Sequence, residues 1–137
     1  MKLCNETITL YNAWHDPDAD KDYWFGTVIR GVSWYDKYVV AMTGSGLRAA
    51  ETYTIRIPLD ADTEEKSYVD PMSYAEADNH GDTFTLRAGD IIVKGEAETE
   101  GMTPTLLNEQ HFRCATILGV TDNRRAPNAP HFRVVGG

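Results

Sequence analysis

The sequence is poor in cysteine and in basic residues, and it contains no long apolar run. Cys4 and Cys114 are its only cysteines, and because they form no metal-binding or redox spacing, we expect two free thiols. No stretch reaches the roughly 20 apolar residues that a membrane-spanning helix needs. The first residues, MKLCNETITLYN, lack the apolar core and cleavage site of a secretion signal, which predicts a protein made in a cytoplasm.

The shortage of basic residues weighs against general nucleic-acid binding. Thirteen Lys and Arg stand against 21 Asp and Glu, a net charge of −8. Sequence-independent affinity for DNA comes mostly from clustered cations on phosphates, so we expect no sequence-specific or general nucleic-acid contact. The acidity suits a surface that DNA passes without sticking, and it equally suits simple solubility.

The chain length predicts one domain, residues 1–137, and the residue pattern predicts a mainly β fold. Alternating apolar residues and clustered β-branched residues predict many short strands, which favours a small β-barrel or sandwich. One short helix is expected at 103–111, with Thr103 as N-cap and Pro104 at its first position. The strands are expected in the segments 6–14, 23–35, 37–43, 52–58, 83–95, 113–123 and 130–137, with a turn around Asp36 and a loop at 44–51. The segment 83–95 is expected to form two short strands about a turn at 88–90.

Residues 59–83 show little strand or helix pattern, which predicts a long loop or arm inserted into the barrel. This segment contains buriable side chains that a disordered acidic loop rarely has, so they are candidate protein-interaction residues. The alternative is a loop that folds back and covers the barrel with its own aromatics. The candidates are Tyr68, Pro71, Met72 and Tyr74.

The stretch WHDPDADKDYWFG has an acid at every second position from Asp16 to Asp22. A calcium-binding EF-loop needs glycine at its sixth position and glutamate at its twelfth, and here these positions hold Lys21 and Thr27. The flanks are also strand-like rather than helical. We therefore expect a solvated turn between two strands, with no metal site and weak calcium binding left open.

No arrangement of residues predicts catalysis or a cofactor. The four histidines do not pair at a ligand spacing, and no nucleophile elbow or phosphate-binding glycine loop is present. The one local basic pair is Arg124 and Arg125, in a turn between two expected strands. These arginines are candidate contacts for an acidic partner, such as a neighbouring copy of this chain, or they belong to a solvent-facing turn.

As a set, several motifs resemble a family of small virion-module proteins of prophages in Gram-positive bacteria, encoded near minor capsid and tail genes. The motifs are ITLYNAW, TVIRGVSWY, YTIRIP, YVDP, FTLRAGDIIVKG and ILGVTDNRRAPNAPHFRVVG. More distantly, the layout is similar to the head–tail connectors of long-tailed phages, proteins of the stopper or adaptor type. The matching positions are Ile8, Thr9, the hairpin 15–22, Gly89, Asp90 and the stretch 117–135.

The resemblance implies a non-enzymatic head–tail connector or minor capsid protein that assembles as a ring without a cofactor. Its partners would be copies of itself and portal, adaptor or tail components, with no membrane, in a virion assembled in the host bacterial cytoplasm. The 59–82 insertion and the 103–111 helix depart from the usual pattern and leave its position in the connector open. The alternative function is a β-barrel module that binds a small molecule or carbohydrate through Trp14, Trp24 and Trp34, unless Trp14 and Trp34 belong to the core.

Overall fold

The computed structural model describes residues 5–43, 46–76, 82–99, 103–110, 114–127 and 130–137. For 37–51 and 108–110 only the path of the backbone is described. The elements, in chain order, are β1 (Glu6–Asp16), β2 (Lys21–Thr43), β3 (Gly46–Pro58), β4 (Ser67–Tyr68), α1 (Pro71–Glu76), β5 (Thr83–Phe84), β6 (Ile91–Lys94), α2 (Pro104–Gln110), β7 (Cys114–Asn123) and β8 (His131–Gly136). The prediction of a mainly β fold is confirmed.

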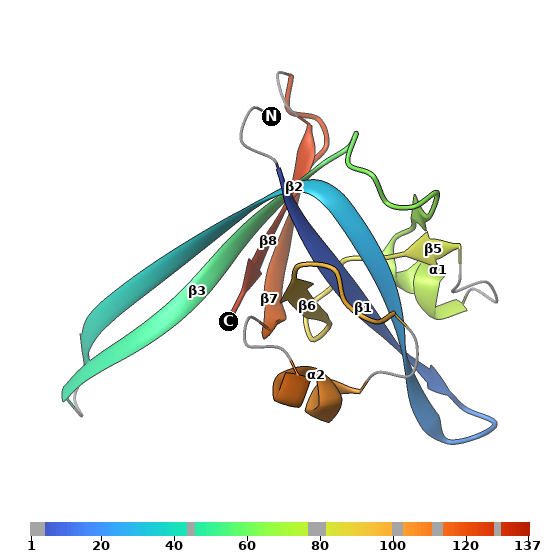
Figure 1. Ribbon diagram of the computed structural model, residues 1–137, viewed down its shortest axis with the longest axis horizontal. Coiled ribbons are helices and arrows are strands. Elements are labelled where there is room, and N and C mark those ends of the chain that lie inside the picture. The colour runs from blue at the N-terminus through green and yellow to red at the C-terminus, as the bar shows by residue number, and fades with distance from the viewer. Residues whose placement is uncertain (1–4, 44–45, 77–81, 100–102, 111–113, 128–129) are drawn as a thin grey trace.

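Six of the strands form a closed antiparallel barrel in the order β1-β2-β3-β8-β7-β6 (Figure 1). Pairing of Ile8–Tyr11 in β1 with Ile91–Lys94 in β6 completes the ring. Closure removes most exposed strand edges, and it leaves the interior to be filled by side chains from alternate positions on each strand. The two remaining strands, β4 and β5, form a small parallel pair beside the barrel.

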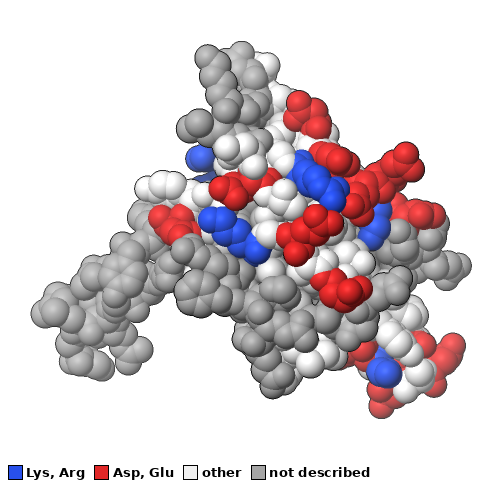
Figure 2. All heavy atoms as spheres, in the orientation of Figure 1, with Lys and Arg blue, Asp and Glu red and all other residues white. Residues whose placement is uncertain are grey.

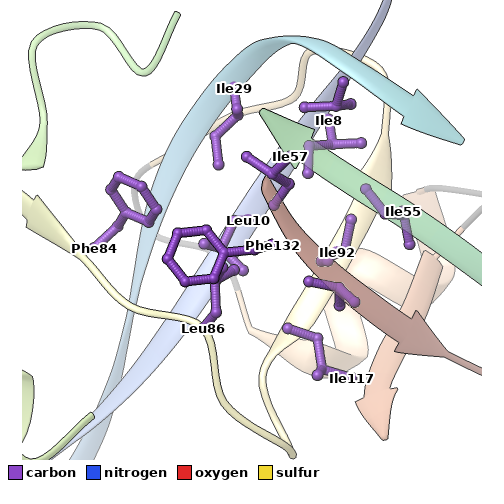
Figure 3. Packing of buried hydrophobic residues seen from close by; sticks show 12 residues of the cluster. Ile8, Leu10, Ile29, Ile55, Ile57, Phe84, Leu86, Ile92, Ile117 and Phe132 are labelled. Carbon is purple, nitrogen blue, oxygen red and sulfur yellow. The ribbon is translucent and has the colours of Figure 1, made fainter. Parts of the chain in front are cut away.

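The barrel interior is packed with branched aliphatic side chains and a few aromatics (Figure 3). Ile8 and Leu10 of β1 point inward, as their alternation predicts, and both are fully buried. The cluster consists of Ile8, Leu10, Ile29, Val32, Ile55, Ile57, Phe84, Leu86, Ile92, Ile117, Phe132 and Val134. The interior is therefore a packed core and not a channel.

A second apolar cluster lies on the outer face of β1 and β6, under α2. Tyr11, Ile91, Val93 and Leu107 are buried there. The predicted helix and its cap are confirmed, because the Thr103 hydroxyl accepts a hydrogen bond from the Leu106 amide at 3.3 Å. The helix thus extends the core beyond the barrel interior.

Two predictions between β2 and β3 are wrong. The sequence suggested a turn around Asp36 and a loop over 44–51, but β2 runs without interruption to Thr43 and β3 begins at Gly46. β2 instead bends at Gly31, which has a φ of 87° and sits where the register with β1 shifts. Beyond this bend β2 and β3 leave the barrel together as a long hairpin (Figure 1).

Gly26 is where the 96–99 segment crosses the outside of β2. Its amide donates a hydrogen bond to the Thr99 carbonyl at 3.2 Å, and a Cβ at this position would meet the Thr99 Cα at 2.7 Å. We expect Gly26→Ala to lower the free energy of unfolding by about 1–3 kcal/mol, because backbone must shift to admit the methyl group. Chemical denaturation measures this. Gly119→Ala is the control, since nothing lies within 4 Å of its added Cβ, and an equal loss in both variants would contradict the crowding.

The buried Tyr11 phenol makes the fold sensitive to alkali. Its hydroxyl donates to the Glu98 carbonyl, and burial raises the pKa of Tyr11 to about 12 from 10.0. The folded state therefore holds this proton more tightly than the unfolded state, so stability is full below pH 10 and falls as the pH rises through 12. Over this interval wild type should lose about 2–3 kcal/mol more than Tyr11→Phe. Denaturation at several alkaline pH values tests this, and parallel pH curves for the two proteins would refute it.

Candidate protein-interaction surfaces

The described residues of the 59–83 segment, 59–76 and 82–83, are folded onto the barrel rather than extended as an arm. The segment contains β4 and the helix α1, so the prediction of a single short helix is wrong, and the predicted long loop carries short secondary-structure elements. The segment covers one end of the barrel and reaches down its side (Figure 1). The alternative weighed for this segment, a cover made with its own aromatics, describes what the structure shows.

Polar contacts to β2 hold this segment in place. Arg30 and Asp62 exchange backbone hydrogen bonds of 2.8 and 2.9 Å, and the Arg30 guanidinium lies 2.9 Å from a Glu64 carboxylate oxygen. Farther on, the Lys66 ammonium donates to the Gly26 carbonyl at 2.6 Å, and burial lowers the pKa of Lys66. These contacts involve residues far apart in the sequence, so local periodicity gives no sign of them.

The four candidate residues of the segment have different environments. Tyr74 is 0% exposed and lies under the Arg87 guanidinium, so it is part of the core and cannot meet a partner. Tyr68 packs against Phe132 with ring centroids 4.6 Å apart and is half-buried. Pro71 and Met72 begin α1 and face solvent, Met72 being 76% exposed. Only these two remain fully available to a partner.

The β7–β8 turn contains the other two candidates, Arg124 and Arg125. Arg124 binds the Asp122 carboxylate through two nitrogens, with Nε at 3.0 Å and Nη2 at 2.7 Å. Its guanidinium also covers the rings of Tyr68 and Phe132 at 5.4 and 5.2 Å. The turn therefore brings one arginine against the 59–83 segment, and joins two groups of candidates that are distant in sequence.

A hollow of about 590 Å³ opens at this turn, lined by residues 122–126. Hydrogen bonds from Arg124 lower the pKa of Asp122, so this carboxylate stays charged and is already bound to Arg124. Within the described residues Arg125 forms no hydrogen bond or salt bridge, and it is exposed. Arg125 is therefore the cation that this hollow offers to a ligand.

A buried polar network supports the other end of the segment, at the predicted turn before β6. Asp90 accepts hydrogen bonds from Asn12 Nδ2 at 2.8 Å, Arg87 Nε at 2.9 Å and the Ala13 amide at 3.2 Å. Burial raises the pKa of Asp90, while these donors act in the opposite direction. Gly89 permits the turn with a φ of 97°. Because all of these donors bind one buried carboxylate, the network has a structural role.

The arm formed by β2 and β3 was not predicted from the sequence. Residues 37–43 of β2 pair only with residues 46–52 of β3, whereas 53–58 of β3 also pair with β8. At about 3.4 Å per residue, seven residues per strand project some 24 Å from the barrel. Figure 1 shows this arm pointing away from all other elements.

The structure offers little that would hold a metal or a small ligand. Among the described residues no three His, Cys, Asp or Glu side chains lie together as metal ligands. The acids from Asp16 to Asp22 lie at the β1–β2 turn, as predicted. An apolar cavity of about 120 Å³ lies between the 59–83 segment and the barrel, lined in part by Tyr68, Phe84 and Phe132. In the part of the chain that the structure describes, no helix is long and apolar enough to cross a membrane.

The fold and these surfaces define a small closed β-barrel protein with a projecting two-stranded arm. The chain belongs to a family of unknown function, DUF6751, whose model matches residues 3–137. The match thus includes the barrel, the arm and the 59–83 segment. No curated protein and no solved structure matches the chain.

Proposed function

We propose that this protein is a structural component of a phage or prophage virion, a head–tail connector or minor capsid protein that assembles as a ring. The observation that carries the proposal is the β2–β3 arm, which pairs only with itself beyond the barrel. A barrel that is already closed has no need of such an arm for its own core. The arm is better suited to contacts outside the monomer.

The energetics of the arm favour an external contact. An isolated two-stranded hairpin is marginally stable in water. Each cross-strand pair contributes about 0.2–1 kcal/mol, whereas ordering the backbone of each residue costs about 1–2 kcal/mol. A neighbouring protein that covers the arm or pairs with its open edges supplies the missing stabilisation.

The sequence of the arm points the same way. Residues 38–42 of β2 are Tyr-Val-Val-Ala-Met, a continuous apolar run, and it pairs with residues 47–51 of β3, Leu-Arg-Ala-Ala-Glu. Strands with one face in water alternate apolar and polar residues, whereas continuous apolar runs are typical of strands covered on both faces. Repetition of one such contact between identical chains produces a closed ring.

The competing function, a binding module for a small molecule or carbohydrate, has weaker support. The 120 Å³ cavity is well below the roughly 300–1,000 Å³ of ordinary ligand sites, and the 590 Å³ hollow is lined by five consecutive residues of one turn, three of them exposed. Trp14, Trp24 and Trp34 are all half-buried; Trp14 stacks on Tyr23 and Trp34 on Tyr53. They are therefore engaged with the barrel instead of forming an open platform for a sugar.

Purified particles test the proposal directly. A tagged chain expressed from an induced prophage is expected to co-sediment with particles through a density gradient and to be detected by mass spectrometry at constant stoichiometry. Protease that cleaves the arm in the isolated chain is expected to leave it intact in particles. A chain that stays at the top of the gradient would contradict the proposal.

A further inference from the structure

We propose that copies of this chain associate head to tail, with the acidic β1–β2 tip of one copy bound at the arginine patch of the next. The tip consists of residues 15–22, and the arginine patch consists of Arg56, Arg124, Arg125 and Arg133. This inference rests on the proposed function and names the contact that would repeat around a ring. The occupant of the patch is a second copy of the same chain.

The arginine patch concentrates half of the eight arginines at one end of the barrel. Arg56 of β3 and Arg133 of β8 lie directly opposite each other in register, and both are exposed. Like charges in such a pair destabilise a sheet. Neither forms a salt bridge with another residue that the structure describes. Arg133 is also paired with Thr121, three residues before Arg124, so the turn and its hollow adjoin this pair.

The acidic tip has the complementary charge and shape. It is a protruding hairpin with the carboxylates of Asp16, Asp18, Asp20 and Asp22 against one lysine (Figure 2, lower right). His15 lies 2.7 Å from Asp22 and 3.3 Å from Asp20, and the Asp20 side chain is 94% exposed. Arginine binds carboxylates in a planar, two-bond geometry, so a protruding aspartate fits a hollow that offers Arg125 beside the exposed Arg56 and Arg133.

The two surfaces lie at opposite ends of the molecule, so they cannot meet within one chain. Glu6 of β1 pairs with Val32, next to the Ser33–Arg56 pair, and β1 then runs eleven residues to the tip. This distance is about 30 Å at the usual rise of a strand. Figure 1 shows the β7–β8 turn at the top and the tip at the lower right. A contact between unlike surfaces of identical chains is heterologous and closes into a ring when the rotation allows.

A nucleic acid is a poorer occupant for the patch. The chain has a net charge of −8, and its acidic surface repels a polyanion at distances comparable to the Debye length. A hairpin tip is compact and can enter the hollow while the rest of its own barrel stays apart. Charge complementarity thus favours the tip.

Charge reversal with restoration tests the contact in the full-length chain. Sedimentation velocity would compare wild type with D18K/D20K, with R125E/R133E and with all four substitutions together. E65K/E76K is the matched control, because it changes two exposed acids outside the tip and shifts the net charge as much as D18K/D20K. Circular dichroism and thermal melting would establish that each variant folds.

We expect each reversal to weaken self-association about tenfold or more, and the combined variant to regain most of it, because the charges are then exchanged. The control should associate like wild type, and about 500 mM salt should weaken wild-type association. Association unaffected by either reversal, no restoration in the combined variant, or a monomeric wild type would overturn the contact. Duplex DNA binding lost in R125E/R133E would assign the patch to phosphates instead. The particle co-sedimentation readout is independent of all these results, so the two proposals fail separately.

Discussion

Replacing Asp90 by alanine is expected to lower the free energy of unfolding by about 3 kcal/mol, because the buried carboxylate is the acceptor for three donors, one of them the half-buried Arg87 guanidinium. Asp90 is 2% exposed and accepts hydrogen bonds from Asn12, Arg87 and Ala13. Its removal leaves the Arg87 guanidinium and two further donors without that acceptor. Urea denaturation followed by tryptophan fluorescence measures the loss.

Two further variants test whether burial of the carboxylate causes this loss of stability. Asp122→Ala also removes a carboxylate bonded to an arginine, but this pair is exposed and screened by solvent, so its loss should be much smaller. Asp90→Asn should recover little, because the amide nitrogen would face another donor, whichever way the side chain is turned. Equal losses for Asp90→Ala and Asp122→Ala would show that burial does not govern the effect.

Removal of the β2–β3 arm is expected to abolish assembly while the barrel still folds. The variant joins Lys37 to Thr52 through Asn-Gly, a sequence that favours the tight turn of a hairpin, and keeps the pairing of 33–36 with 53–56. The deleted residues pair only with each other, and the strand pairs that close the barrel lie outside them. The melting temperature should therefore change by only a few degrees, whereas formation of oligomers or incorporation into particles should fall below detection.

A matched control distinguishes the effect of losing the arm from the effect of changing its turn. This control keeps both strands and replaces only Gly44 and Ser45 by Asn-Gly, and it should assemble like wild type. Native mass spectrometry and particle incorporation give the two readouts. Normal incorporation of the arm-deleted chain would remove the observation on which the proposed function rests.

The parts of the fold that were predictable are those encoded in neighbouring residues. The alternation around Ile8 and Leu10 identified the inward face of β1, and Thr103 with Pro104 identified the start of α2. In each case the signal and the structure lie within a few residues of each other. The mainly β prediction follows from the same local patterns.

The arm and the 59–83 segment were missed because distant contacts determine them. Asp36 and the glycines at 44 and 46 have the composition of turns and loops, but the register between β2 and β3 places Asp36 opposite Tyr53 inside one continuous hairpin. In the segment, β4 has only two residues and α1 six, too few to produce a periodic pattern. Contacts of Arg30 and Lys66 stabilise them.

The candidate interaction residues show the same difference between local sequence patterns and distant contacts. Composition correctly identified Arg124 and Arg125 as a basic pair in a turn between strands, but it gave no sign that Arg124 covers Tyr68 and Phe132. It also grouped Tyr74 with Met72, although the structure buries the first and exposes the second. Burial depends on which face of α1 meets the barrel, and a six-residue helix shows this only in three dimensions.

The most direct test of the proposed function is to delete the gene from an inducible prophage that contains it and to image the lysate by electron microscopy. The account predicts DNA-filled heads lying apart from finished tails, or incomplete heads if the protein is a minor capsid component. Complementation with the wild-type gene should restore whole particles, and the arm-deleted gene should not. Intact particles in normal numbers without the gene would contradict the proposed function.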